Sequence, residues 1–306
     1  MGKRLLLAAA ALIVLPLVGG FAVFFVFPGV LITAGQWSAA RGAGLQTRVV
    51  TADGTPVHVF VGGPAHGPAL VLLHGMADDR HSFVNAAADL TDRYRVVLPD
   101  LRGHSDNRRD PDADHSIRGQ VRLVAGLADT LGLDRFDLGG NSMGGHVSAA
   151  FALAYPDRVR RLVLVNAPGL KLGDHEVYAG FEGELKTRAD FDALMQRVLH
   201  RPPALPGPVA DHLRERANAN AAFVNRMAAQ VRDGVDYDLK DRLAELSAPT
   251  LVLWGEHDRV VPFDVAEAWR DGLPDGEFQL LSDAGHSPQL EQPAEVAAAI
   301  RAFLDR

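Results

Sequence analysis

Short apolar runs that alternate with helical patterns constrain the fold of this chain more than any other feature. The runs predict buried strands at Val57–Val61, Ala69–Leu73, Tyr94–Leu98, Phe136–Leu138, Arg161–Val165, Thr250–Trp254 and Glu277–Leu281. Between them, helices are predicted at Phe83–Leu90, Ile117–Leu131, Gly145–Ala154, Phe263–Asp271 and Pro293–Leu304. Such alternation is typical of a mostly parallel, doubly wound sheet with helices on both faces. We therefore expect an α/β fold.

The alternation breaks once, between Gly169 and Ala248, where no buried strand is predicted. Helical stretches near Ala189–His200 and Val209–Arg232 fill this part of the chain. We interpret residues 171–247 as a helical cap or lid, inserted before the last two strands of a domain that spans residues 48–306.

The segment Leu5–Phe27 contains no charged residue. As a helix it would be roughly 34 Å long, enough to cross a hydrocarbon core of about 30 Å. We predict a single-pass membrane anchor in residues 1–32 and a tether, rich in alanine and glycine, in residues 33–47. Lys3 and Arg4 favour a cytoplasmic N-terminus, which places the bulk of the chain on the extracytoplasmic side.

Two other interpretations of the N-terminal segment stay open. A secretory signal cleaved near Ser38-Ala39-Ala40 would release the protein from the cell. The segment could also be a buried core helix, although such helices seldom run this long without a polar face.

Composition excludes several classes of site and partner. The chain has no cysteine, which excludes disulfide scaffolds, thiol nucleophiles and cysteine-ligated metal sites. Its net charge of −7 argues against a nucleic-acid partner. The sequence contains no metal-spaced histidine cluster, no phosphate-binding loop and no dinucleotide-binding glycine pattern, so we predict no metal and no cofactor.

The chemistry begins at Gly140-Asn141-Ser142-Met143-Gly144, directly after a predicted buried strand and before a predicted helix. A serine on such a sharp turn projects its hydroxyl from the sheet edge, and Gly140 and Gly144 allow strand and helix to pass closely. The alternative is a glycine-rich turn with a serine helix cap. We predict that Ser142 is a nucleophile.

A serine hydroxyl needs a base and a group that orients the base. His286 follows the last predicted strand, at the edge where such sheets bind ligands. Asp258 follows the strand Thr250–Trp254 and is our candidate for the orienting acid, with Glu256 and Asp264 as alternatives.

The negative charge that develops on the substrate oxygen needs backbone N–H donors. We expect one from Met143, at the start of the helix after the nucleophile. The second is expected from Met76, in the loop that follows the strand Ala69–Leu73.

These motifs, together with Pro99–Ser105, resemble those of α/β-hydrolases from about residue 48 to the end of the chain. The resemblance implies the α/β-hydrolase fold and the triad roles of Ser142, Asp258 and His286. The stretch from Ser116 to Leu170 is similar to bacterial true lipases and to membrane-anchored monoacylglycerol lipases.

We therefore expect a serine carboxylic-ester hydrolase that works through an acyl-enzyme on a small-molecule ester or lipid and meets the membrane through its N-terminal helix. Three alternatives stay open: a meta-cleavage-type C–C bond hydrolase, a cofactor-free haloperoxidase or perhydrolase, and a non-catalytic hydrolase-like membrane protein. The C–C hydrolases share Gly-Asn-Ser-Met-Gly-Gly, but this chain lacks their usual Gly-Pro-Gly after His74-Gly75.

Overall fold

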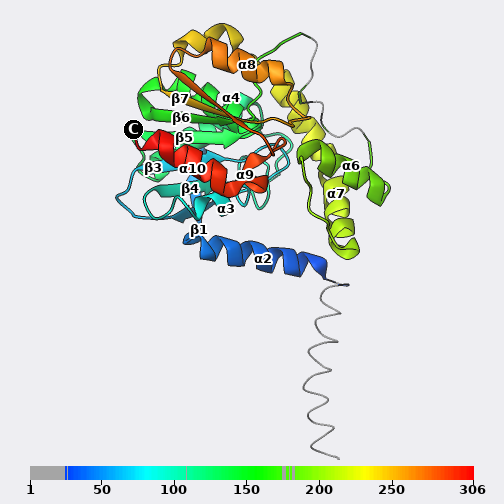
Figure 1. Ribbon diagram of the computed structural model, residues 1–306. Coiled ribbons are helices and arrows are strands. Elements are labelled where there is room, and N and C mark those ends of the chain that lie inside the picture. The colour runs from blue at the N-terminus through cyan, green and yellow to red at the C-terminus, as the bar shows by residue number, and fades with distance from the viewer. Residues whose placement is uncertain (1–24, 26, 108, 174–176, 179, 181–182) are drawn as a thin grey trace, which may run out of the picture.

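The computed structural model describes residues 25, 27–107, 109–173, 177–178, 180 and 183–306. Its centre is an eight-stranded sheet with the order β1-β2-β4-β3-β5-β6-β7-β8 (Figure 1). The strands are β1 (Leu45–Ala52), β2 (Thr55–Gly62), β3 (Ala69–Leu73), β4 (Arg95–Pro99), β5 (Phe136–Asn141), β6 (Val159–Val165), β7 (Thr250–Gly255) and β8 (Gly276–Leu281). β2 pairs antiparallel with β1 and with β4, and the other neighbours are parallel. The predicted α/β fold with a mostly parallel sheet is confirmed.

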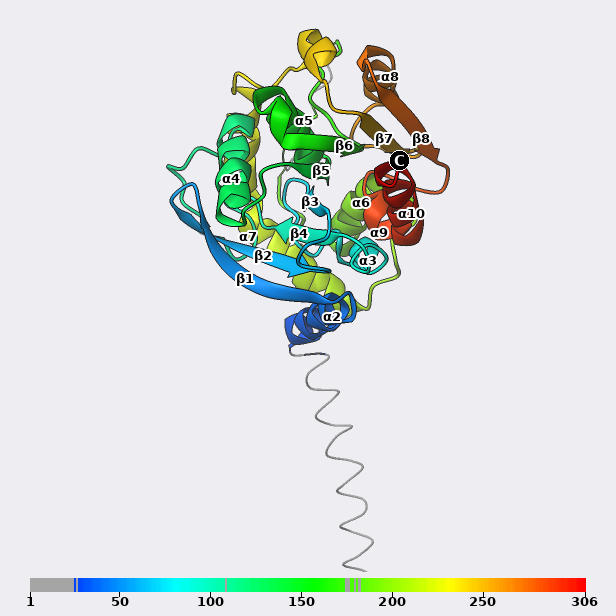
Figure 2. The same ribbon diagram turned by 90° about the vertical axis from the view of Figure 1, so that its left-hand side faces the viewer.

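Helices cover both faces of the sheet (Figure 2). One face packs against α4 (Ile117–Thr130), α5 (Met143–Ala154) and α8 (Phe263–Gly272). The other packs against α3 (Val84–Ala87), α10 (Pro293–Leu304) and the end of α2 (Pro28–Gly42). A short α9 (Pro288–Glu291) precedes α10.

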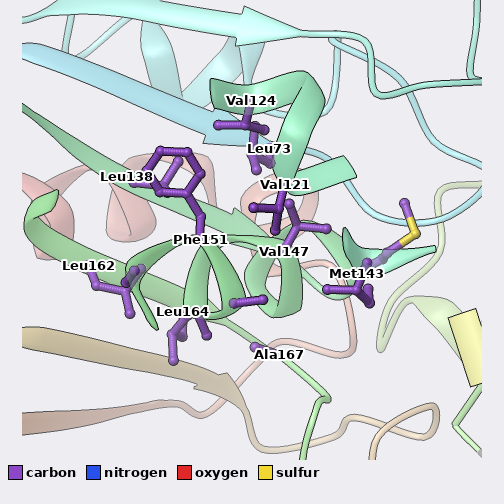
Figure 3. Close-up of a cluster of buried hydrophobic side chains, with 14 of the residues drawn as sticks. Leu73, Val121, Val124, Leu138, Met143, Val147, Phe151, Leu162, Leu164 and Ala167 are labelled. Carbon is purple, nitrogen blue, oxygen red and sulfur yellow. The ribbon is translucent and has the colours of Figure 1, made fainter. Parts of the chain in front are cut away.

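The core is built by alternation along the buried strands. In β3, Leu70 and Leu72 face one layer of helices, whereas Val71 and Leu73 face the other. Figure 3 shows the second layer, in which side chains of α4 and α5 meet those of β3, β5 and β6. Because both faces of the central strands are buried, most of their side chains are apolar, which is why the sequence pattern predicted these strands.

The helices α6 (Arg188–Val198) and α7 (Gly207–Arg232) lie between β6 and β7 in the chain, where the sequence predicted an inserted cap. In Figure 1 they stand beside the sheet, at the ends of the strands, rather than on either face. α6 begins with a capping box in which Thr187 and Asp190 bond each other's backbone N–H.

Residues 33–47, predicted as a tether, differ from that expectation. Helix α2 continues to Gly42, and β1 starts at Leu45. The alanines favour helix, and α2 gains further stability by packing against α3, α7 and β1. β1 escaped prediction because it is an edge strand with mostly exposed side chains, which lacks the apolar run of a buried strand.

Two other predicted elements differ in their bounds. The helical pattern Phe83–Leu90 forms an α-helix only over Val84–Ala87, and β4 begins at Arg95 rather than Tyr94. The remaining predicted strands and helices are present, with ends that differ by a few residues at most.

The predicted anchor segment Leu5–Phe27 lies outside the described residues except for Phe25 and Phe27. Within the part of the chain that the structure describes, no helix has both the length and the apolar character needed to cross a bilayer.

Candidate active site

Ser142 occupies the turn between β5 and α5. Its backbone has φ +53° and ψ −124°, in the left-handed region that residues other than glycine rarely adopt. The Ser142 N–H donates to the carbonyl of Val165, 2.9 Å away, which ties the turn to β6. Such a conformation costs about 1–3 kcal/mol and is typical of functional turns.

The glycines on either side of Ser142 are required by close backbone contacts. A Cβ on Gly140 would lie 2.5 Å from the carbonyl carbon of Gly144, and one on Gly144 would lie 2.2 Å from the carbonyl oxygen of Leu73. Real Cβ atoms do not approach backbone so closely. The sharp strand-to-helix turn inferred from the glycine spacing is therefore present, and it rests against the end of β3.

His286 and Asp258 are hydrogen-bonded to each other, with 2.9 Å between His286 Nδ1 and Asp258 Oδ2. They lie in the loops after β8 and β7, and both side chains are buried. The two loops touch closely, because a Cβ on Gly255 would meet the carbonyl oxygen of Gly285. The backbone N–H of His286 donates to the carbonyl oxygen of Val198, at the end of α6, over 2.8 Å.

Asp258 is held by more than His286. Its Oδ2 also accepts from Asn166 Nδ2 at 2.6 Å, and its Oδ1 accepts from the N–H groups of Val260 and Val261 at 2.7 and 3.0 Å. Burial raises the pKa of Asp258, but the facing His286 ring and these hydrogen bonds lower it more, so the net pKa lies below the usual aspartate value. The carboxylate is therefore ionised at neutral pH.

The two alternative acids are placed differently. Glu256 and Asp264 are exposed, whereas the side chain of Asp258 is only 2% exposed and points at His286. Of the three carboxylates predicted as candidates, the structure brings Asp258 to the histidine.

Ser142 and His286 line one cavity of about 750 Å³. Met76 also lines it, from the loop after β3. That loop lies against the serine, since a Cβ on Gly75 would be 3.2 Å from Ser142 Cβ. Much of the remaining wall is apolar and comes from the helices α6 and α7, including Phe191, Leu194, Met195, Phe223, Val224 and Met227.

The two predicted oxyanion donors belong to neighbouring segments, the start of α5 and the loop after β3. Met143 is the first residue of α5, where an N–H has no acceptor within the helix. The side chain of His74 fixes the loop that contains Met76. His74 Nε2 accepts a hydrogen bond from the backbone N–H of Leu101 at 2.9 Å. The ring proton is therefore on His74 Nδ1, which donates to the carbonyl oxygen of Gly75 at 2.7 Å.

Sequence reasoning missed two asparagines. Asn166 follows β6, has φ +46°, bonds Asp258 and accepts from the N–H of Gly255 at 3.1 Å through its Oδ1. Asn141, just before the serine, donates to the carbonyl of His286 at 2.9 Å. Each is a polar residue at the carboxyl end of a buried strand, and that position was the available signal.

The described residues contain no group of three or more histidine, aspartate and glutamate side chains placed to hold a metal ion.

Comparison with known proteins identifies the family. Residues 70–299 match the alpha/beta hydrolase family. Lipase 3 of Moraxella sp. (strain TA144) is 30% identical over 247 residues, which is 78% of each chain. Human monoacylglycerol lipase ABHD6 is 26% identical over 97% of this chain and 93% of its own.

A solved structure is similar over nearly the whole length. The crystal structure of a membrane phospholipase A, described as a bacterial virulence factor, has a TM-score of 0.85 and 34% identity over 99% of this chain and 98% of its own. The chain belongs to the alpha/beta hydrolase family.

Proposed function

We propose that this member of the alpha/beta hydrolase family is a serine hydrolase of carboxylic esters, with lipid esters such as monoacylglycerols as its substrates. The observation that supports this most directly is the 2.9 Å bond between His286 Nδ1 and Asp258, in a cavity that His286 shares with Ser142 on its strained turn.

The proposed reaction has two halves. Ser142 Oγ attacks the ester carbonyl while His286 Nε2 takes the serine proton, and the C–O bond then breaks as His286 returns that proton to the leaving alcohol. Water repeats the sequence on the acyl-enzyme and releases the acid. Asp258 keeps the proton of the neutral imidazole on Nδ1, which leaves Nε2 free to act as the base.

The oxyanion would be bound by the N–H groups of Met143 and Met76. Helix α5 strengthens this site, because the positive end of its dipole lies at Met143. Removal of one such donor typically costs about 10²–10³ in rate, so the two together carry a large part of the proposed catalysis.

The size and the lining of the cavity support a lipid ester as the substrate. Its volume of about 750 Å³ and its wall of leucine, methionine, valine and phenylalanine side chains suit an acyl chain. Two relatives of this chain are named as a lipase and as a monoacylglycerol lipase, and a third as a membrane phospholipase A.

The membrane is part of the proposal. Leu5–Phe27 would anchor the chain, and the excess of positive charge at Lys3 and Arg4 would keep the N-terminus in the cytoplasm and the catalytic domain outside it. Carbonate washing of membranes tests the anchor: retention of the full-length chain is expected, whereas its release would contradict a spanning segment.

The test of the active site is covalent labelling combined with ester hydrolysis. A fluorophosphonate probe should label the wild-type chain, and Ser142→Ala should abolish both labelling and hydrolysis of p-nitrophenyl esters. Ser282→Ala changes an exposed serine outside the cavity and serves as the control that keeps both. Labelling that survives Ser142→Ala would overturn the assignment of the nucleophile.

A further inference from the structure

Helix α2 presents two different faces. Phe27, just before the helix, and Val30, Leu31 and Trp37 within it are each between 41% and 58% exposed. Together with Ala34 they recur at helical spacing and form one outward strip, which we call the outer strip. Large apolar side chains gathered on one exposed strip mark an interaction surface.

The opposite side of α2 borders the catalytic cavity. The cavity that contains Ser142 and His286 is also lined by Ile32, Gly35, Gln36 and Ala39 of α2. The residues that bury α2 against the protein, Ile32, Gln36 and Ala40, follow each other at intervals of four, and the outer strip is turned away from them.

The helix is held firmly in this position at both ends. A Cβ on Gly29 would lie 2.9 Å from the ring of His212, so α2 crosses the cap helix α7 at close range. At the other end, Thr91 Oγ1 donates to Ala43 O at 2.9 Å. In Figures 1 and 2, α2 lies below β1 and beside α7, along the outside of the molecule.

The chemistry of the outer strip and of the chain before it points to a lipid surface. Leu5–Phe27 has no charged residue and leads directly into α2. The single charged residue of α2 is Arg41, in its last turn, one turn beyond Trp37. Aromatic and cationic side chains at the end of an apolar strip are typical of helices that lie in a membrane interface.

We propose that the outer strip of α2 lies in the surface of the lipid bilayer and that lipid esters pass from the bilayer along the opposite side of α2 to Ser142. The route rests on the proposed ester hydrolase function, whereas the contact with lipid does not. The partner of the outer strip in this proposal is the bilayer itself. Binding of a second copy of the chain to the strip is the alternative that the experiment below distinguishes.

Trp37 allows a direct test of the contact. The other tryptophans, Trp254 and Trp269, are fully buried, so quenching by lipids with brominated acyl chains reports on Trp37 alone. The full chain is placed in phosphatidylcholine vesicles with and without brominated lipid. We expect bromine-dependent quenching in the wild type and in Ser142→Ala, and none in Trp37→Phe.

The route is tested by activity on two forms of substrate. Leu31→Glu puts a carboxylate on the outer strip and should lower hydrolysis of lipid esters within vesicles by about tenfold, because a charge resists leaving water. Hydrolysis of a dissolved short-chain ester should change less than twofold. Val235→Glu, at a residue that is 73% exposed beyond the far end of α7, is the control that should change neither.

The outcomes separate the two proposals. Equal emission in brominated and plain vesicles overturns the lipid contact, and cross-linking between Trp37→Cys chains would then assign the strip to a second copy. Quenching with unchanged vesicle activity in Leu31→Glu overturns the route. Loss of quenching cannot follow from a wrong nucleophile, because Ser142→Ala is expected to be quenched like the wild type.

Discussion

The cavity has two walls that are built in different ways. The wall at the sheet edge consists of loops fixed by short hydrogen bonds and by backbone contacts that admit no Cβ, at Gly140, Gly144 and Gly255. The opposite wall consists of the helices α2, α6 and α7, whose side chains are mostly half-buried or exposed. In the proposed reaction, the first wall would set the geometry of the catalytic groups, and the second would select the molecules that reach them.

The largest expected effect is at the sheet-edge wall. Asp258→Asn removes the charge but keeps the size, and the wrong histidine tautomer should lower kcat by about 10³–10⁴-fold. Urea unfolding of Asp258→Asn should show a cooperative transition, which indicates that the variant is folded. Asp264→Asn, which changes the exposed alternative acid, should retain near-wild-type kcat. A large loss of kcat in Asp264→Asn, with near-wild-type kcat in Asp258→Asn, would assign the orienting carboxylate to Asp264.

The second prediction concerns the contact between α5, the helix that follows Ser142, and the cap segment 171–247. His146, on α5, is fully buried and bridges to the cap: its Nδ1 accepts from Tyr178 Oη at 2.9 Å, and its Nε2 donates to Asp236 O at 2.8 Å. Burial lowers the pKa of His146 to about 4.

The unfolded chain binds a proton at His146 more readily than the folded protein does. The contribution of neutral His146 to the free energy of unfolding is therefore fully present above the ordinary histidine pKa, and it is lost as the pH falls from about 6.5 toward 4. Between pH 7 and 4.5 the loss due to His146 should be about 2–3 kcal/mol. Urea unfolding of the wild type and of His146→Gln measures it, and equal pH dependence in both would contradict the prediction.

A smaller effect is expected at Asn166. Asn166→Gly removes the amide that bonds Asp258 and Gly255 but tolerates the positive φ, so kcat should fall about tenfold, the equivalent of one hydrogen bond to a charged group. Asn166→Ala loses the same bonds and adds backbone strain, which should lower the free energy of unfolding by about 1 kcal/mol more than glycine does. Equal stability of the two variants would show that the backbone relaxes.

The smallest effect is expected at the helical wall. Leu194→Trp enlarges a side chain that lines the cavity and should lower kcat/KM for long acyl esters several-fold, with little change for acetate or butyrate esters. A series of p-nitrophenyl esters measures this, with Val235→Trp on the surface as the control. An equal loss at every chain length would indicate a distorted site rather than a shortened acyl pocket.

The difference between the walls also explains what could be predicted from the sequence. The strands that carry Ser142 and Asp258 are buried on both faces, so their apolar runs were visible, and the glycines around Ser142 marked the turn. Asn166 was not predicted because its contacts depend on the pairing of β6 with β7. The residues next to Asn166 in the sequence give no sign of that pairing.

Prediction failed where burial is partial. α2 has apolar residues on both its inner and outer sides, so its pattern shows no clear polar face. The sequence suggested the end of an anchor up to residue 32 and a tether after it. Which residues of α6 and α7 line the cavity also depends on how the helices cross, and several arrangements would satisfy the same sequence pattern.

The position of α2 bears on how the protein can be shortened for laboratory work. A truncation at residue 48, the first residue of the domain as judged from sequence, would delete Ile32, Gln36 and Ala39 along with the hydrophobic leader. The shortened chain would lack part of the cavity wall and would lose the first three residues of β1, including Leu45. A shortened form that keeps the cavity intact should therefore begin no later than Pro28, and the cavity of shorter forms would have a different shape.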